Sequence, residues 1–201
     1  MALPLLGGVV KLAKECKPTK TNSELEEFWL FSICVAGKES ALQKERVRAF
    51  LDSIPFCGSP FKKVSAAIAD GSLDMHLRKC KLGRYERTSK AFQQSIGLKL
   101  ETSTLDDLED VYGVGPKTSR FFLLHTRHDV RVAVLDTHIL KRLRETYPDA
   151  PKATPQSRRE YRKWEKHALE LADKDGLSPF EFDKVNWTRF AVSTRAQNEG
   201  N

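Results

Sequence analysis

The sequence is poor in three features that define large protein classes: long apolar runs, strand-forming stretches and closely spaced cysteines. No apolar run approaches the roughly 20 residues that a helix needs to cross a bilayer. Residues 1–10 lack the basic start and the cleavable apolar segment of a secretory signal. We therefore expect an intracellular protein without membrane contact.

Cysteine occurs at four widely separated positions: Cys16, Cys34, Cys57 and Cys80. These residues form no C-x-x-C pair, and no histidine accompanies them at the spacing of zinc ligands. The sequence therefore predicts reduced thiols, no bound metal and no cofactor.

Acidic residues are outnumbered by basic ones, 27 against 34, which gives a formal net charge of +7. Phosphate polyanions such as DNA are the commonest reason for such an excess. On charge alone, a basic surface without such a partner is an equally good interpretation. The hydrophobic share of 40% is that of a globular protein. Its 201 residues suffice for one core or for two small lobes.

Helix signals dominate the chain and predict an all-α fold. The longest β-branched cluster, residues 130–134, is interrupted by Arg131 and lies just before a predicted helix. Capping residues, prolines and glycines predict helices at residues 23–35, 41–54, 61–70, 72–80, 84–96, 105–111, 116–126, 136–143, 158–172 and 179–193.

The first predicted helix begins with Ser23 and Glu26, in the S-x-x-E order of a capping box. Apolar residues then follow on several faces, which is typical of a buried central helix. We expect Trp29 and Phe31 to lie in the core.

Residues 108–143 contain the clearest local pattern. A short helix, the turn at residues 113–115 and a second helix opened by Pro116 predict a helical hairpin. Glycine suits the turn because it tolerates positive φ and lets a ligand approach the backbone. The first amides of the second helix, together with its dipole, suit a phosphate. Alone, G-x-G between helices is more often a structural turn than a phosphate site.

The hairpin sequence G-V-G-P-K-T at residues 113–118 is followed by L-D-T-H-I at residues 135–139, so Asp136 comes 19 residues after Lys117. Together they resemble the helix-hairpin-helix DNA glycosylases, the superfamily of endonuclease III and the 8-oxoguanine glycosylases. Looser similarity covers residues 31–38 and 82–91, and the D-x-x-x-W pattern from Asp183 to Trp187 resembles the closing helix of that family.

The resemblance implies two helical lobes with a DNA-binding cleft between them. Residues 21–130 would form a central helical barrel that ends in the hairpin, and residues 1–20 with 131–201 the second lobe. The implied partner is double-stranded DNA that contains a damaged base, bound by a monomer. The implied activity is that of a DNA glycosylase with AP-lyase activity, which removes an oxidised base through a lysine Schiff base.

Lys117 and Asp136 are the expected catalytic residues. A lysine attacks as the neutral amine, which the positive end of a helix dipole favours. Attack on C1′ of a flipped-out nucleotide gives a Schiff base and then β-elimination, while Asp136 stabilises oxocarbenium-like charge on the sugar. Taken singly, Lys117 is an ordinary solvated lysine and Asp136 an ordinary N-cap. Only the joint pattern supports catalysis.

Other residues are expected to contact DNA: Gly113, Val114, Gly115, Thr118, Lys38, Arg120 and His138. Candidate phosphate contacts, each more commonly a solvated charge, are Arg84, Arg87, Lys90, Arg120 and Arg142. His138 is either a hydrogen-bonding core residue, which we favour, or a groove contact. Lys38 is a wedge in the gap left by the flipped base, a phosphate contact or a plain surface residue.

Three departures from the family pattern bear on function. No cysteine follows Cys80, so the [4Fe–4S] cluster of many members is not expected. Tyr112 replaces a smaller residue at the start of the hairpin, and the pocket indicates no particular lesion. Two alternatives therefore stay open. One is an enzyme that displaces pyrophosphate from a hydroxymethyl pyrimidine without excising it, as viral relatives are thought to do. The other is a DNA-binding module without catalysis.

Overall fold

The computed structural model describes residues 20–198, with side chains described as far as residue 190, and every regular element in that part of the chain is a helix. The predicted all-α class is confirmed. The helices are α1 (Asn22–Val35), α2 (Ser40–Ser53), α3 (Pro60–Ala69), α4 (Leu73–Lys79), α5 (Tyr85–Ser95), α6 (Leu105–Glu109), α7 (Pro116–Thr126), α8 (Thr137–Thr146), α9 (Arg158–Lys174) and α10 (Pro179–Asn198).

The start of α1 differs from the predicted one. The capping box is formed by Thr21 and Glu24, whose carboxylate accepts from the Thr21 amide at 2.8 Å. The sequence offers two such pairs in overlapping registers, Thr21 with Glu24 and Ser23 with Glu26. Glu26 instead accepts a hydrogen bond from the Phe61 amide at the start of α3, at 2.8 Å. A tertiary contact thus decides between two locally equivalent caps.

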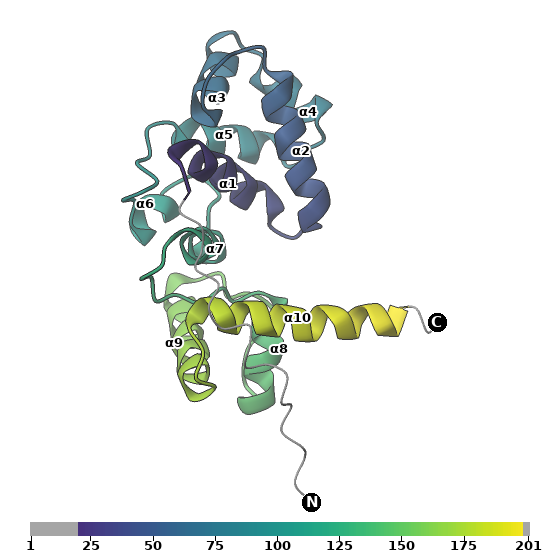
Figure 1. The fold of residues 1–201 in the computed structure, drawn as a ribbon, viewed down its shortest axis with the longest axis vertical. Helices are drawn as coiled ribbons and strands as arrows, with labels where there is room; N and C mark the ends of the chain where they lie inside the picture. Colours follow the sequence, from purple (N-terminus) through teal and green to yellow (C-terminus); the bar gives the residue numbers. More distant parts are fainter. Residues whose placement is uncertain (1–19, 199–201) are drawn as a thin grey trace, which may run out of the picture.

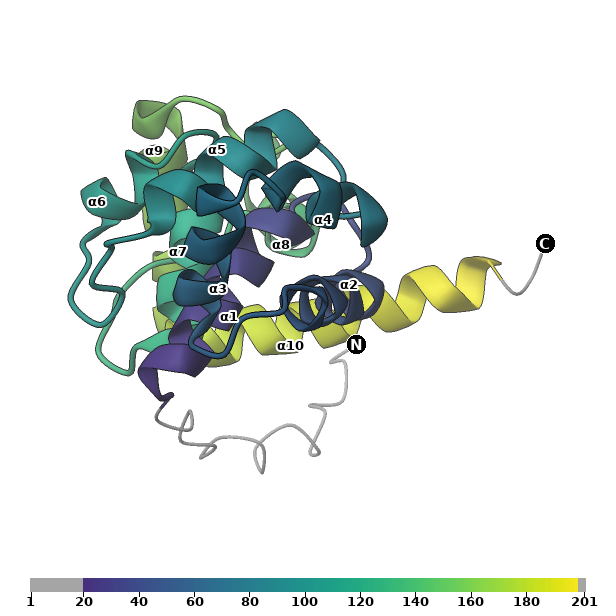
Figure 2. The ribbon, with the colours of Figure 1, turned by 90° about the horizontal axis from the view of Figure 1, so that it is seen from above.

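The helices fall into two groups with α7 between them (Figure 1). One group comprises α1 to α5 and the other α8 to α10, and α1 packs against α2, α3, α5 and α7. Seen from above, α10 extends away from the helical body toward its C-terminal end (Figure 2). No helix within residues 20–198 is both long and apolar enough to cross a membrane.

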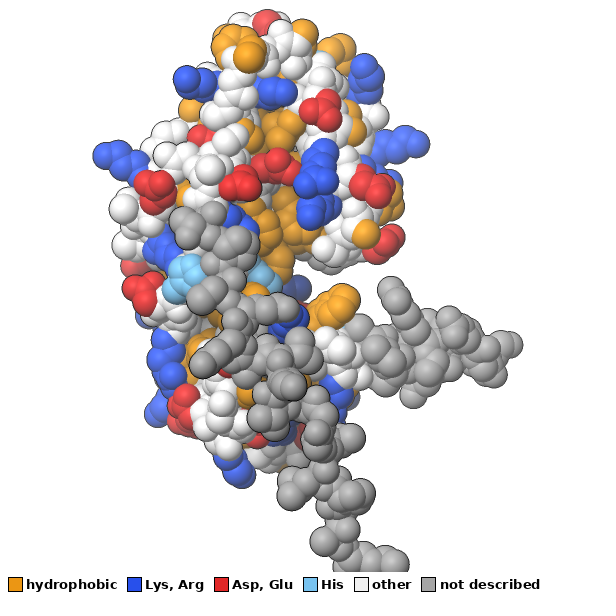
Figure 3. Space-filling model, viewed as in Figure 1, with side chains coloured by type: hydrophobic (Ala, Val, Ile, Leu, Met, Phe, Trp, Pro, Cys, Tyr) orange, Lys and Arg blue, Asp and Glu red, His pale blue; other side chains and the backbone are white. Residues whose placement is uncertain are grey.

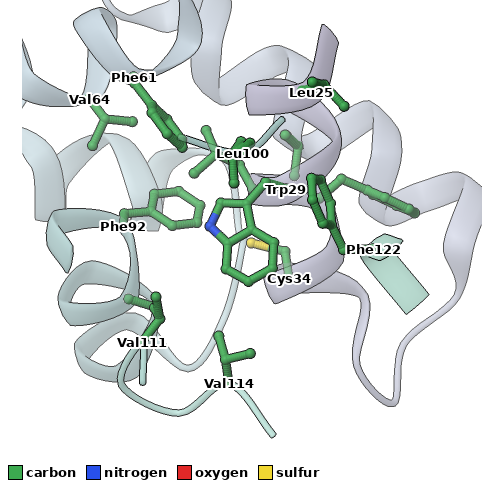
Figure 4. Packing of buried hydrophobic residues seen from close by; sticks show 14 of the residues in the cluster. Leu25, Trp29, Cys34, Phe61, Val64, Phe92, Leu100, Val111, Val114 and Phe122 are labelled. Carbon is green, nitrogen blue, oxygen red and sulfur yellow. The ribbon is translucent and has the colours of Figure 1, made fainter. Parts of the chain in front are cut away.

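Trp29 lies at the centre of the larger of two hydrophobic cores (Figure 4). Its side chain is fully buried, and the indole N–H donates to Ser95 Oγ at 2.8 Å. Phe122 of α7 meets the indole edge-on at 5.1 Å between ring centroids. Phe31 is also buried, so the core placement predicted for Trp29 and Phe31 is confirmed. This packing fixes α7 against the barrel helices.

The segment between α7 and α8 joins the two cores. Val132 and Val134 pack in the larger core, whereas Ala133 and Leu135 pack in the smaller one with α8 and α9. This alternation is that of an extended chain, which explains the β-branched residues here. The Tyr161 hydroxyl of α9 accepts from the Leu135 amide at 2.8 Å and donates to the Ala133 carbonyl at 3.1 Å, in place of a neighbouring strand.

The predicted lobe boundary at residue 130 stays a prediction. The first part of the predicted second lobe, residues 1–19, lies outside the described residues.

Candidate functional site

Helices α6 and α7 form the predicted hairpin. Thr104 caps α6 through a reciprocal pair of hydrogen bonds with Asp107. The side chains of Val111 and Val114 flank the turn and point into the larger core (Figure 4). The Val114 amide donates to the Val111 carbonyl at 2.9 Å. Val114 is therefore an anchor for the turn, and neither its side chain nor its amide faces a ligand.

The two glycines of the turn meet different requirements. Gly113 has a φ of +75°, and an added Cβ there would overlap the side chain of Arg87, which donates to the Gly113 carbonyl. Gly115 has a φ of −114°, which any residue adopts. A Cβ at Gly115 would meet no atom within 4 Å beyond its chain neighbours. Positive φ explains the need for glycine at position 113 only. At position 115 the absence of a side chain leaves open space beside the backbone.

Lys117 lies at the second position of α7, after Pro116 at the first. Its side chain is half-buried. The Thr118 amide donates back to the Gly115 carbonyl at 3.0 Å. Pro116 has no N–H, so Gly115 and Lys117 supply the backbone amides on either side of it at the start of α7.

Asp136 is the N-cap of α8, as the sequence predicts for an aspartate before a helix. Oδ1 accepts from the amides of His138 at 2.8 Å and Ile139 at 2.9 Å. Both bonds use the same oxygen, so Oδ2 is left for another partner. A cap of this kind holds the carboxylate rigidly at the end of the extended segment.

Asp183 of α10 was not assigned a role from the sequence, although it opens the D-x-x-x-W pattern. Its side chain is 17% exposed and its carboxylate lies 3.7 Å from Nε2 of His125 on α7. Burial, and then the charge of Asp136, raises the pKa of Asp183 to about 7, whereas the charge of Lys117 acts to lower it. The charges of Asp136 and Lys117 therefore act in opposite directions on the pKa of one carboxyl group.

Aromatic residues of α10 stand beside Asp136. The His138 ring packs edge-on to Trp187, at 6.3 Å between centroids, and stacks with Phe190 at 6.5 Å. Trp187 is 53% exposed, far more than either other tryptophan. His138 Nδ1 is buried without a hydrogen-bond partner among the described residues, and the contacts of the ring are with these aromatic side chains. Whether His138 is a core residue or a groove contact stays a prediction.

Arg120 lies where a phosphate cannot reach it, in contrast to its predicted role. Its guanidinium is 3% exposed and pairs with Glu109 and Glu165. Arg142, another candidate phosphate contact, is 17% exposed and pairs with Asp175 at 3.1 Å. Its two partners place the Arg120 side chain between α6 and α9.

Lys38 reaches back to the barrel. Its ammonium group donates to the Leu82 carbonyl, and burial lowers its pKa. This contact ties the α1–α2 turn to the segment before α5. The three roles expected for Lys38 stay predictions. Arg84, Arg87 and Lys90 are exposed at and after the N-cap of α5. Arg87 and Lys90 contact the hairpin at Gly113 and Tyr112, and Lys90 also pairs with Glu86.

The recess above α10 is lined on its barrel side by hydrophobic side chains (Figure 3). Within residues 20–198, no group of three or more histidine, cysteine or acidic side chains is arranged to hold a metal ion. The chemistry available here is that of an amine, two carboxyl groups and aromatic rings.

No protein-family model matches the chain, and no curated protein matches it. Solved structures, in contrast, match most of the chain. The 8-oxoguanine glycosylase/lyase of Methanocaldococcus jannaschii, in complex with a 15mer DNA containing 8-oxoguanine, is 19% identical with a TM-score of 0.63; the match covers 84% of this chain and 81% of that one. The 8-oxoguanine DNA glycosylase of Thermotoga maritima is 18% identical with a TM-score of 0.61, over 83% and 79% of the two chains. This chain therefore shares the fold of these 8-oxoguanine DNA glycosylases.

Proposed function

We propose that the protein is a DNA glycosylase with AP-lyase activity, in which Lys117 is the nucleophile and Asp136 stabilises charge on the sugar. The observation that supports this most directly is that α10 packs against both α7, which carries Lys117, and α8, which Asp136 caps. This packing supports one site that draws on the hairpin and on the α8 cap, as the chemistry requires.

DNA would bind across the hairpin. The open space at Gly115 and the amides of Gly115 and Lys117 suit a backbone phosphate. Arg84 and Lys90 at the start of α5 would neutralise neighbouring phosphates, with Arg87 already bonded to the turn. Residues 21–130 and the lobe that starts at residue 131 would hold the duplex between them. We propose that the protein acts as a monomer inside the cell, where its DNA substrate lies.

The target base would leave the stack of the duplex and enter the recess above α10. Trp187 offers an exposed aromatic face next to His138, and aromatic rings hold an unstacked base well. The fold likeness to enzymes of 8-oxoguanine supports an oxidised base as substrate.

The reaction would proceed at C1′ of the sugar. The Lys117 amine forms a bond to C1′ while the C1′–N bond to the base breaks, and the base departs with that electron pair. Asp136, capped rigidly at Oδ1, presents its carboxylate to the positive charge that develops on the sugar. The C1′–O4′ bond then breaks, with O4′ taking up a proton, which opens the sugar ring and gives the Schiff base. Loss of a proton from C2′ breaks the C3′–O3′ bond, and the 3′ phosphate leaves by β-elimination.

The test uses the full-length protein and a duplex with a single abasic site, in the presence of borohydride. We expect a covalent protein–DNA adduct that is absent in Lys117→Ala. Lys166→Ala is the matched control, because Lys166 on α9 is 78% exposed and pairs only weakly, at 3.9 Å, with Glu170 of its own helix. An adduct that survives in Lys117→Ala would contradict the assignment of the nucleophile.

The alternatives give different results. A DNA-binding module would bind duplex in a salt-sensitive manner and form no adduct. A base-modifying enzyme would yield a substituted pyrimidine, detected by mass spectrometry of digested DNA, and no free base.

A further inference from the structure

The turn of the hairpin carries an exposed aromatic side chain, that of Tyr112, which is 48% exposed. The Val114 amide donates to the Val111 carbonyl, so Tyr112 and Gly113 are the two central residues of a four-residue turn. Gly113 has a φ of +75° and Tyr112 does not have a positive φ, which is the pattern of a type II turn. The side chain of Tyr112 therefore stands at the tip of the hairpin.

Helix α5 holds this turn from one side. The side chain of Gln94 accepts a hydrogen bond from the Tyr112 amide at 2.6 Å, and Arg87 donates to the Gly113 carbonyl. Arg87 and Gln94 are seven residues apart on α5, about two turns, so they lie on one face of that helix. Both contacts use the backbone of the turn, so they fix the turn without using the ring of Tyr112.

Lys90, on the same face of α5, places a positive charge beside the exposed ring. Its ammonium group lies 5.2 Å from the centroid of the Tyr112 ring. Lys90 also pairs with Glu86 of its own helix at 3.0 Å, between side chains that are 51% and 83% exposed. A pair so exposed is worth no more than about 1 kcal/mol. Because an ammonium group has three donors, Lys90 can bind a phosphate while it stays beside the ring.

The two sides of the turn differ in charge. Arg87 and Lys90 are exposed on the α5 side. On the α6 side, the side chains of Asp106 and Asp110 are 72% and 79% exposed. Arg158 of α9 approaches these two carboxylates no closer than 3.7 Å, so it offsets their charge only in part. A DNA strand at the hairpin is therefore attracted to the α5 side, where the exposed ring lies.

We propose that Tyr112 is a stacking platform for an unpaired base of the bound DNA, with Lys90 on a neighbouring phosphate. This inference rests on the proposed function, because it takes DNA as the partner. Exposed aromatic rings beside cations are the means by which proteins bind single-stranded nucleic acid. A base inside an intact duplex has both faces covered by its neighbours. The ring therefore favours DNA in which a nucleotide near the hairpin is unpaired.

The experiment measures the affinity of the full-length protein for a labelled single strand and for the duplex formed from it, by fluorescence anisotropy. For Tyr112→Ala we expect single-strand affinity to fall about tenfold, equivalent to about 1.4 kcal/mol, and duplex affinity to change by less than about twofold. Tyr112→Phe should bind as the wild type does, because stacking needs only the ring. Tyr112→Leu should behave like Tyr112→Ala, because it is apolar but has no aromatic face.

Two further variants separate stacking from charge. Lys90→Ala should weaken binding to both DNA forms and reduce the slope of log affinity against log salt concentration by about 1. Phe56→Ala is the matched control, since Phe56 is an aromatic residue of the α2–α3 loop that is 46% exposed. It should leave both affinities unchanged. The thermal midpoint of each variant shows whether it is folded.

Several results would overturn the inference while leaving the proposed function intact. One is single-strand affinity that is unchanged in folded Tyr112→Ala, and another is an equal loss on the duplex. Full retention in Tyr112→Leu would show packing against the sugar in place of base stacking, and this variant decides the matter if the alanine variant does not fold. A wild-type protein that binds the duplex but no single strand would also contradict the inference. Failure to bind either form would instead contradict the proposed function.

Discussion

Arg120 of α7 and Glu165 of α9 form a two-point ion pair across the junction of the two helical groups. Nε lies 2.9 Å from Oε1, and the second guanidinium nitrogen lies 3.1 Å from Oε2. The same arginine pairs with Glu109 of α6, and Glu165 also accepts from the Ala133 amide at 3.1 Å. The pair therefore joins the hairpin, the extended segment and the second core.

Removal of this arginine should destabilise the whole fold. Arg120→Ala leaves Glu165 buried without its counter-charge and leaves Glu109 with Arg158 alone, which should lower the free energy of unfolding by about 3–5 kcal/mol. Urea denaturation would measure the loss. Arg131→Ala is the control, because that side chain is 58% exposed and its pair with Asp173 is worth no more than about 1 kcal/mol. Equal effects of the two variants would contradict the structural role of Arg120.

The two hairpin glycines should respond in opposite ways to the same substitution. Gly113→Ala imposes a left-handed conformation on alanine and a clash with Arg87, so it should cost at least about 1–2 kcal/mol of stability. Gly115→Ala has room and an ordinary φ, so its stability should change by no more than about 0.5 kcal/mol.

DNA binding separates the two glycines further. The Cβ of Gly115→Ala would occupy the space proposed for a phosphate, and affinity for a duplex should fall about tenfold, equivalent to about 1.4 kcal/mol. Fluorescence anisotropy with a labelled duplex would measure it. Unchanged affinity in a folded Gly115→Ala protein would place the phosphate elsewhere.

Asp183 should reduce stability as the pH rises. Its pKa is 3.8 as a free group and about 7 in the folded protein, so between these values the native state binds more protons than the unfolded state. The free energy of unfolding must then fall across that window. Asp183→Asn removes the effect and should be the more stable protein above neutral pH, by on the order of a few kcal/mol. Denaturation at several pH values should show the difference shrinking toward acidic pH, and a constant difference would disagree with this account.

Trp187 should dominate the fluorescence response to DNA. Trp29 and Trp164 are 0% and 3% exposed, against 53% for Trp187, so acrylamide should quench Trp187 first. An abasic duplex that covers the recess above α10 should protect Trp187 from the quencher. Trp187→Phe should abolish both effects while the thermal midpoint is retained. Protection that persists in this variant would show that DNA approaches another tryptophan.

Local sequence determined most of the secondary structure. Pro116 at the first turn of α7, the Thr104 cap of α6 and the Asp136 cap of α8 each act through bonds within a few residues. Such signals can be predicted from the sequence because both partners lie in the same short segment. The hairpin follows from the same short-range patterns, whereas Lys117 and Asp136, 19 residues apart, become candidates only through the joint pattern that resembles the glycosylase family.

Only the tertiary structure decided which polar groups meet. Thr21 and Ser23 offered equivalent caps, and the contact of Glu26 with α3 selected between them. The burial of Arg120 and the position of Asp183 beside α7 depend on partners more than 40 residues away in the chain. Burial and charge at such distances are set by how helices pack, and the local pattern that predicts a helix does not specify which helix covers each of its faces.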